Sequence, residues 1–167
     1  MIAIVDYGAG NLRSVTNAIA KLGYQPKVTS SPDEVLDAQA VILPGVGAAA
    51  DTMENLKKLG MVDSIVQLIA EERPFFGVCI GLQILCTGTE EGGGHKCLNI
   101  IPGQVRKLPP GLKVPHMGWN QIEWSGDCPL LRGVEQNSFV YFVHSYYGVP
   151  QETEDVRTFY PTSVMET

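Results

Sequence analysis

The sequence has few of the features that mark nucleic-acid-binding, membrane or secreted proteins. Its 167 residues include 12 Lys and Arg against 18 Asp and Glu, for a formal net charge of −6, and they contain no run of basic residues. This charge argues against a nucleic-acid partner, because binding to a phosphate backbone relies on clustered cations. No apolar stretch is long enough to cross a bilayer, and the N-terminus lacks a basic leader. We therefore expect a cytoplasmic protein with no membrane partner.

The cysteines also lack the spacing of a disulfide framework or a zinc site. Four are present, at positions 79, 86, 97 and 128, and no two form a Cys-x-x-Cys pair. Free thiols are therefore predicted, and neither a metal nor another cofactor is expected. Cys86, Cys97 and Cys128 are interpreted as packing residues.

The order of predicted elements indicates an α/β fold in a single domain that spans residues 1–167. With 44% hydrophobic residues, the chain is long enough to form one sizeable core. Strands are predicted over Ile2–Asp6, Pro26–Thr29, Val41–Leu43 and Pro74–Val78, and helices over Leu12–Leu22, over 49–72 with a break near Gly60, and over Ile80–Cys86. Such alternation predicts a mainly parallel sheet with helices on both faces.

The second half of the chain has a different pattern. Three segments resemble strands, with Gly- and Pro-rich turns and no long helix between them: Gln104–Leu108, Gly118–Trp124 and Phe139–Tyr147. We expect these strands to extend the parallel sheet.

The most informative segment runs from Phe75 to Leu85, where an apolar run turns through Gly77 and Gly81 around Cys79. A Gly-x-Cys-x-Gly turn is typical of a nucleophile elbow, which ends a strand abruptly and places the sulfur in the first turn of the next helix. Free N–H groups and the helix dipole stabilise a thiolate there. Cys79 is therefore a candidate nucleophile, and the alternative is a small core residue.

A second glycine-rich loop strengthens the nucleophile hypothesis. The strand predicted at Val41–Leu43 is followed directly by Pro44-Gly45-Val46-Gly47-Ala48. Acyl transfer needs two backbone N–H donors where negative charge develops on the carbonyl oxygen. Ile80, which follows the cysteine, is the first candidate, and Val46 or Gly47 is the second. Without the elbow, the loop would be interpreted as an ordinary turn between a strand and a helix.

Five segments, in order along the chain, resemble the glutaminase subunit of imidazole glycerol phosphate synthase, a class I triad amidotransferase of histidine biosynthesis. They are IVDYGAGNL at 4–12, PGVG at 44–47, GVCIGLQ at 77–83, PHMGWN at 115–120 and YFVHSYY at 141–147. The elbow and the PGVG loop occur across class I amidotransferases, whereas DYGAGNL and PHMGWN are characteristic of this subunit. The resemblance implies a three-layer, flavodoxin-like fold and the hydrolysis of glutamine to glutamate and ammonia.

One segment of the family pattern is missing. Class I amidotransferases complete the triad with the His and Glu of an F-H-P-E segment, which lies two strands beyond the region matching Tyr141–Tyr147. Three histidines are present, His95, His116 and His144, and none precedes Pro-Glu. Arg157–Ser163 only partly resembles the motif, with Tyr160 in place of the catalytic His and Thr162 in place of the Glu that orients it. We therefore expect a C-terminally incomplete domain, impaired turnover, and a bare apolar surface that favours a homodimer.

The resemblance also implies which residues hold glutamine. Gln83, Ser145 and Tyr146 match positions that contact the substrate in the family. His144 could be considered as a substitute base. It alternates with its neighbours along a predicted strand, however, and would then point away from the substrate.

The partner implied by the resemblance is a (β/α)8 barrel synthase subunit that receives the ammonia. Asn11 and Trp119 match positions that face this subunit, and Tyr141 is expected to join them. Asn11 could instead be a helix N-cap, and Trp119 a core aromatic residue, although either role is compatible with contact.

The sequence leaves three hypotheses open. The chain is a glutaminase subunit, a pseudoenzyme that retains the binding surface, or a cysteine hydrolase or thiol sensor with a similar elbow. Gln83 argues against the third, because this position in the amidotransferase motif contacts glutamine. Relatives of the subunit also serve sugar amidation in surface-polysaccharide pathways, and the motifs are compatible with that variant.

Overall fold

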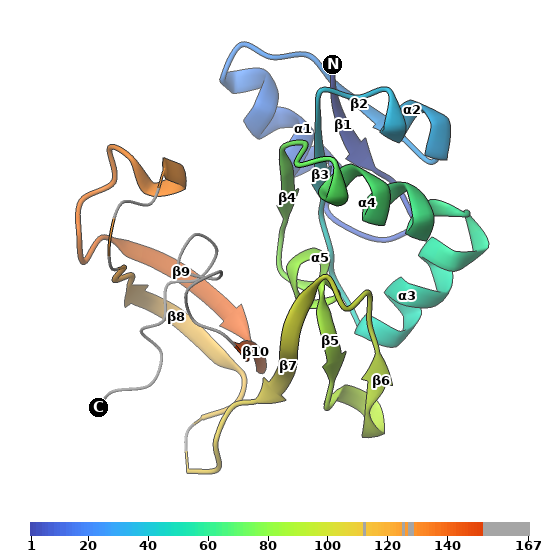
Figure 1. Ribbon diagram of the computed structural model, residues 1–167. Helices are drawn as coiled ribbons and strands as arrows, with labels where there is room; N and C mark the ends of the chain where they lie inside the picture. Colours follow the sequence, from blue (N-terminus) through green and yellow to red (C-terminus); the bar gives the residue numbers. More distant parts are fainter. Residues whose placement is uncertain (112, 125, 127–128, 152–167) are drawn as a thin grey trace.

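The computed structural model describes residues 1–111, 113–124, 126 and 129–151 (Figure 1). The features predicted for Cys128 and for Arg157–Ser163 lie outside these residues. The described chain forms a parallel sheet, a mixed sheet and a separate two-stranded hairpin. None of its described helices is both long and apolar enough to cross a membrane.

The first half of the chain forms the predicted α/β unit. Its parallel sheet has the order β2-β1-β3-β4, with β1 at Ile2–Val5, β2 at Pro26–Thr29, β3 at Ala40–Leu43 and β4 at Phe75–Gly77. The helices are α1 (Leu12–Lys21), α2 (Pro32–Leu36), α3 (Ala49–Lys58), α4 (Met61–Ala70) and α5 (Ile80–Gln83). The predicted break between α3 and α4 is confirmed at Gly60, whose φ of 68° favours glycine.

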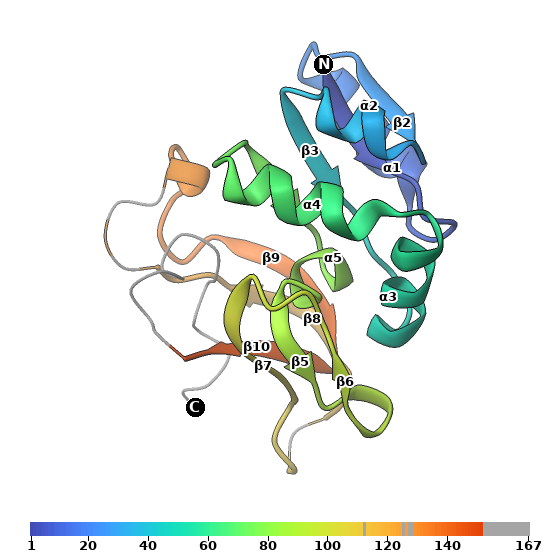
Figure 2. The ribbon, with the colours of Figure 1, turned by 45° about the vertical axis from the view of Figure 1, so that its right-hand side comes forward.

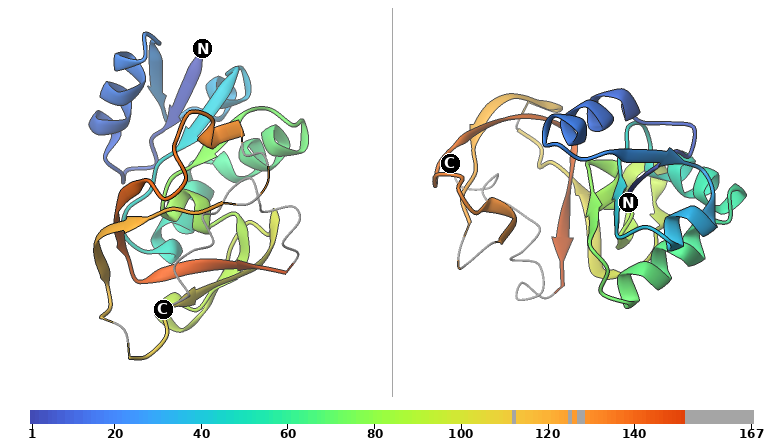
Figure 3. Two further views of the ribbon diagram at one scale, coloured as in Figure 1. Left: turned by 90° about the vertical axis from the view of Figure 1, so that its left-hand side faces the viewer. Right: turned by 90° about the horizontal axis from the view of Figure 1, so that it is seen from above.

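Helices cover the parallel sheet on both faces, but unequally. The view from above in Figure 3 shows α1, in dark blue, on one side of the sheet and α4, in green, on the other. The α4 side holds the main core, in which Val5, Leu43 and Ile65 are fully buried. On the α1 side, Ile42 pairs with Phe76 across β3 and β4, and Phe76 remains 48% exposed. The cover on that side is therefore incomplete over β4.

The strands of the second half do not extend the parallel sheet, so that prediction is wrong. A mixed sheet has the order β10-β7-β5-β6, with β5 at Cys86–Thr89, β6 at His95–Lys96, β7 at Ile101–Lys107 and β10 at Tyr146–Pro150. A parallel neighbour of β4 would need a long crossover connection. The chain instead leaves α5 at Gln83 and enters β5 at Cys86, so Cys86 lies in a strand rather than in the predicted helix.

The remaining strands, β8 (His116–Gln121) and β9 (Phe139–His144), form an antiparallel hairpin. Figure 1 and the view from above in Figure 3 show the hairpin to one side of the parallel sheet. The predicted strand Phe139–Tyr147 is in fact two strands, because Ser145 interrupts it between β9 and β10. Two short 3-10 turns complete the described elements, η1 at Glu91–Gly93 and η2 at Pro129–Leu131.

Candidate active site

Cys79 lies at the turn between β4 and α5, as the elbow motif predicts. It is the N-cap residue of α5 and has φ 55° and ψ −114°, a conformation that side chains other than glycine rarely adopt. A backbone of this kind costs about 1–3 kcal/mol and persists only where the surroundings hold it. The sulfur is on an exposed residue. The predicted strain at Cys79 is therefore confirmed, and the alternative of a buried core cysteine is wrong.

The glycines of the elbow allow backbone to pack directly on backbone. A Cβ added to Gly77 would lie 2.6 Å from the carbonyl oxygen of Gly81, and one added to Gly45 would lie 2.6 Å from the Gly81 nitrogen. A Cβ on Gly81 would collide with the backbone of Leu43 at the end of β3. These contacts seat α5 against both strands, and Figure 2 shows α5 between the parallel sheet and the mixed sheet.

The PGVG loop lies against the same turn. It links β3 to α3, and the Val78 N–H donates to the carbonyl oxygen of Leu43 at 3.0 Å, which ties the elbow to the start of the loop. Ile80 is the first residue of α5, so its N–H has no acceptor within the helix. Val46 is 52% exposed, and Gly47 has φ +91° with open space around its Cα. The candidate oxyanion donors therefore belong to two segments in direct contact.

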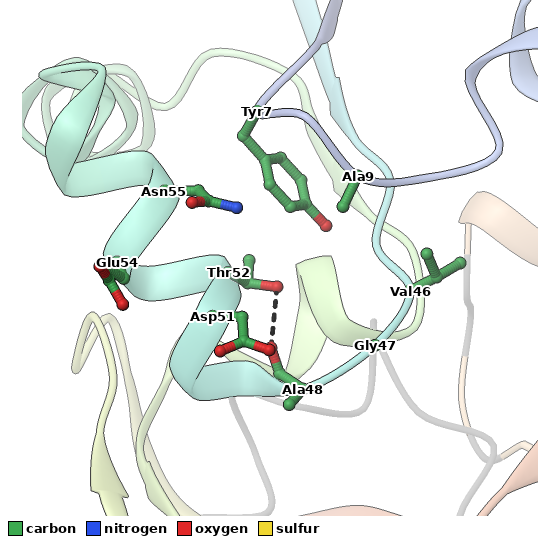
Figure 4. Close-up of a pocket in the computed structure, with 9 residues that line it drawn as sticks. All are labelled: Tyr7, Ala9, Val46, Gly47, Ala48, Asp51, Thr52, Glu54 and Asn55. Atoms are coloured by element: carbon green, nitrogen blue, oxygen red, sulfur yellow. Dashed lines mark hydrogen bonds between the residues drawn. The ribbon is translucent and has the colours of Figure 1, made fainter.

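A pocket of about 440 Å³ opens beside this loop (Figure 4). Its lining residues come from the segment after β1, from the PGVG loop and from α3: Tyr7, Ala9, Val46, Gly47, Ala48, Asp51, Thr52, Glu54 and Asn55. The Tyr7 ring is 3% exposed, and Figure 4 shows its hydroxyl directed toward the space between Thr52 and Val46. The hydroxyl is close enough to the Thr52 side chain and the Val46 backbone to interact with them, but no hydrogen bond of standard geometry joins it to a described residue.

The Tyr7 hydroxyl is also coupled electrostatically to the nucleophile. Burial raises the pKa of the Tyr7 hydroxyl, the Thr52 side chain and the Val46 backbone partly oppose this, and negative charge on Cys79 raises it further. Sequence reasoning missed this residue as part of the site. The only signal in the sequence was its place in the DYGAGNL segment, which does not distinguish a site residue from a core aromatic one.

The structure brings together two of the three predicted glutamine-contacting residues. Gln83 is 8% exposed, and its Nε2 donates to the carbonyl oxygen of Tyr146 at 3.5 Å. Ser145 lies between β9 and β10, and its carbonyl oxygen accepts from the Leu108 N–H at 2.9 Å. The first turn of the elbow helix is thus linked to the start of β10.

His144 is engaged with this same strand rather than with the cysteine. Its Nδ1 lies 3.1 Å from the carbonyl oxygen of Tyr146, and its Nε2 lies 3.2 Å from Nδ1 of His116. Because a carbonyl oxygen only accepts, Nδ1 of His144 carries a proton. In the neutral pair, His116 then donates to His144. The break at Ser145 interrupts the alternation expected along this strand, but both nitrogens of His144 have partners other than Cys79.

The predicted partner-facing residues are all exposed. Asn11 caps α1, with its Oδ1 accepting from the Ser14 N–H at 3.2 Å, so the helix-cap interpretation is confirmed. Trp119 is 69% exposed and Tyr141 56% exposed, and their rings meet edge to face across the hairpin at 5.6 Å. The alternative of a core aromatic residue is therefore wrong for Trp119.

The other cysteines of the described chain differ from Cys79 in their surroundings. Cys86 is buried, and burial followed by the nearby Cys97 raises its pKa to about 11. Cys97 is half-buried against the core, and burial together with the charge of Glu91 raises its pKa. Packing roles are thus confirmed for both residues. Within the described ranges, no group of three or more His, Cys, Asp or Glu side chains could hold a metal ion.

Comparison with known proteins agrees with this geometry. The family profile of class-I glutamine amidotransferases matches residues 3–165. The chain is 52% identical over 152 residues to the imidazole glycerol phosphate synthase subunit HisH of Dehalococcoides mccartyi strain CBDB1, covering 91% of this chain and 74% of the relative. It is 50% identical over 155 residues to the HisH subunit of Moorella thermoacetica, covering 93% and 74%.

Solved structures share the fold at low sequence identity. A crystal structure of a glutamine amidotransferase superposes with a TM-score of 0.67 at 17% identity, covering 91% of this chain and 75% of the other. The structure of PurLQS from Thermotoga maritima gives a TM-score of 0.64 at 18% identity, covering 90% and 69%. Taken with the family profile and the elbow, these matches show that the chain belongs to the class-I glutamine amidotransferase family.

Proposed function

We propose that this chain is the glutaminase subunit of an imidazole glycerol phosphate synthase, which hydrolyses glutamine to glutamate and supplies ammonia for histidine biosynthesis. The observation that carries the proposal is the strained elbow at Cys79, seated against the PGVG loop. The HisH relatives, about half of whose aligned residues are identical, support this specific subunit.

In this proposal, the Cys79 thiolate attacks the carboxamide carbon of glutamine. A sulfur–carbon bond forms, and the electron pair of the carbonyl moves to its oxygen, where the N–H groups of Ile80 and of Val46 or Gly47 stabilise the negative charge. Collapse of this intermediate breaks the carbon–nitrogen bond and releases ammonia, and water then hydrolyses the thioester to glutamate.

Substrate selection is assigned to the segments that flank the elbow helix. Gln83 lies next to Cys79 in the first turn of α5, and its side chain reaches Tyr146. We assign Gln83, Ser145 and Tyr146 to binding of the glutamine backbone. The bonded pair of His116 and His144 reaches the same Tyr146 carbonyl oxygen through Nδ1 of His144 and so helps to fix the start of β10.

Proton transfer is the step for which the described residues provide the fewest suitable acid or base groups. Ammonia must be protonated as it leaves, and the attacking water must be deprotonated. His144, the substitute base considered from the sequence, is bonded to His116 and to the carbonyl oxygen of Tyr146. We therefore propose that this chain forms the thioester more readily than it hydrolyses it, so that turnover is impaired.

The partner is assigned to the exposed face of the hairpin. Besides Gln121, its outer face carries apolar and aromatic side chains that are each more than half exposed, namely Met117, Trp119, Phe139, Tyr141 and Val143. Trp and Tyr are enriched among the residues that dominate protein interfaces. We propose that this face, together with Asn11, contacts the barrel cyclase subunit that consumes the ammonia.

Labelling of the thiols tests the nucleophile directly. The full chain is treated with 6-diazo-5-oxo-L-norleucine, a glutamine analogue that alkylates nucleophilic cysteines with loss of N2, and the adducts are mapped by mass spectrometry. We expect Cys79 to be modified much faster than Cys86 and Cys97, because it alone of the three is exposed and belongs to the elbow.

The matched control for the labelling is Cys79→Ala, in which rapid labelling should disappear. Equal labelling of all cysteines would exclude a glutamine site at the elbow. A Cys79 that reacts with iodoacetamide but not with the glutamine analogue would exclude it as well. A glutamate-release assay with a barrel cyclase subunit added then measures turnover, which we expect to be roughly 10²–10⁴-fold below that of the Moorella thermoacetica HisH subunit.

A further inference from the structure

His116 and His144 face each other across the β8–β9 hairpin. They are directly opposite in the strand register, and their rings meet edge to face with centroids 5.3 Å apart. Nδ1 of His116 lies 3.2 Å from Nε2 of His144. Both rings also pack against Phe142, at centroid distances of 5.3 and 5.6 Å. The two partly buried imidazoles are therefore held in a defined relative orientation.

The carbonyl oxygen of Tyr146 accepts hydrogen bonds from two segments. Nδ1 of His144 donates to it at 3.1 Å, and Nε2 of Gln83 donates to it at 3.5 Å, which is long for a hydrogen bond. The bond from His144 is therefore the shorter and the stronger of the two. Because Gln83 and Tyr146 are both assigned to binding of glutamine, this oxygen joins two segments of the proposed substrate site.

The bond to Tyr146 exists in only one neutral form of His144. A neutral imidazole carries its proton on one nitrogen and presents a lone pair at the other. With the proton on Nε2, the lone pair of Nδ1 would face the lone pairs of the Tyr146 carbonyl oxygen and repel them. Which nitrogen is protonated is set by the hydrogen bond that the other nitrogen makes. For His144, that other bond is the contact between Nε2 and His116.

We propose that His116 is a positioning residue of the glutamine site, which acts by holding His144 in the Nδ1-protonated form. Donation from Nδ1 of His116 occupies the lone pair on Nε2 of His144, so the proton of His144 stays on Nδ1 and binds Tyr146. The inference rests on the proposed function, since Gln83 and Tyr146 bind glutamine only if Cys79 attacks it. His116 acts through His144 and does not take part in the reaction itself.

The protonation of each ring nitrogen can be measured directly by NMR on the full chain with isotopically labelled histidine. Protonated and unprotonated ring nitrogens have well-separated chemical shifts, and the variants His95→Phe and His116→Phe assign the signals of the three histidines. In mildly alkaline solution, where imidazoles are neutral, we expect His144 of the parent chain to carry its proton on Nδ1. In His116→Phe, we expect a mixture of both neutral forms of His144.

Inactivation of Cys79 by 6-diazo-5-oxo-L-norleucine measures the effect on the site. In His116→Phe, which keeps an aromatic ring beside Phe142, the half-saturating concentration of this glutamine analogue should rise roughly fivefold, as loss of one hydrogen bond implies. The maximal rate and the rate with iodoacetamide should change less than about twofold, because the thiol and its accessibility are unaltered.

Two matched variants accompany this measurement. His116→Asn places an amide nitrogen close to the position of Nδ1 and should restore most of the affinity for the analogue. His95→Phe makes the same change as His116→Phe at an exposed position of β6, and it should behave like the parent chain.

A double substitution separates this role from ordinary packing. His144→Asn keeps an amide N–H that can donate to Tyr146, but it has no alternative neutral form for His116 to exclude. In that background, His116→Phe should raise the half-saturating concentration less than about twofold, because both substitutions act through one bond. A purely structural role of His116 would instead lower the affinity equally in both backgrounds.

Three results would overturn the inference. They are a proton on Nε2 of His144 in the parent chain, a protonation pattern that His116→Phe leaves unchanged, and an equal effect of His116→Phe with and without His144→Asn. If the parent chain does not react with the analogue, the proposed function fails, and the NMR spectra still decide whether His116 sets the form of His144. The parent spectrum needs no variant and therefore tests the inference even if His116→Phe does not fold.

Discussion

The parallel-sheet unit and the β8–β9 hairpin use the same side-chain alternation in opposite ways. In β1 and β3, residues on both faces are buried, as with Ile4 and Val5 at 0% exposure, because helices lie on either side. In the hairpin, one face is half-buried and the other is exposed, with Trp119 at 69%. A two-stranded hairpin is at best marginally stable alone. The unit that carries the nucleophile therefore has its central strands buried within the chain, whereas the hairpin has apolar surface available for a partner.

The largest effect expected from this contrast is on stability. Ile65, fully buried in α4 against the parallel sheet, should cost about 3 kcal/mol of unfolding free energy when changed to Ala, through lost burial and a residual cavity. Its neighbour Val66, 40% exposed, is the matched control and should cost less than about 1 kcal/mol as Val66→Ala. Urea unfolding measures both. Similar losses for the two variants would show that α4 is not packed as described.

A second test concerns Cys86, the first residue of β5, where the chain passes from the parallel-sheet unit into the mixed sheet. Burial raises the pKa of this thiol to about 11, above the value of an exposed cysteine, so the unfolded chain loses its proton first as the pH rises. Stability should therefore be unaffected below about pH 8.5 and should fall by about 2–3 kcal/mol as the pH approaches 11.

Cys86→Ala should remove that part of the alkaline loss, and Cys79→Ala, at an exposed position, should retain it. Urea unfolding at a series of pH values from about 7 to about 11, which spans the window between the unfolded and folded pKa values, provides the measurement. A parallel decline in all three proteins would indicate that Cys86 is not buried in solution.

The smallest effect on stability is expected in the hairpin. Trp119→Ala should change the unfolding free energy by less than about 0.5 kcal/mol, because the ring is exposed, but should weaken binding of a barrel cyclase subunit by about 2 kcal/mol, roughly thirtyfold. Calorimetric titration measures the binding, and Val134→Ala, exposed elsewhere on the chain, is the control. If Trp119→Ala instead lowered the unfolding free energy and left the affinity unchanged, the hairpin face would be part of the folded core rather than a partner surface.

The first half could be predicted from the sequence because its signals are local. The Asn11 side chain caps the start of α1, and Gly23, with a positive φ, follows its end. The glycines on either side of Cys79 allow the close backbone contacts that the elbow requires. Each of these signals lies within a few residues of the element that it defines.

The second half could not be predicted in the same way, because strand pairing depends on distant residues. Nothing near Cys86 indicates that β5 pairs with β6 and β7 rather than with β4. The bond from the Ala49 N–H to the Glu91 carboxylate and the placement of the Tyr7 hydroxyl likewise arise from tertiary packing. The family resemblance implied that Gln83 and Tyr146 each contact the substrate, but it did not predict the bond between them.

The glycine contact between the elbow and the PGVG loop has a consequence for how such a site can evolve. Gly45 and Gly77 both pack on the backbone of Gly81, and Gly81 packs on the backbone of Leu43, so none of the three can gain a side chain while the surrounding backbone stays in place. In a complete mutational scan, these positions should behave as one epistatic unit, in which every single replacement is deleterious and no second replacement within the trio rescues it. The two halves of the oxyanion site are therefore locked to glycine at these three positions.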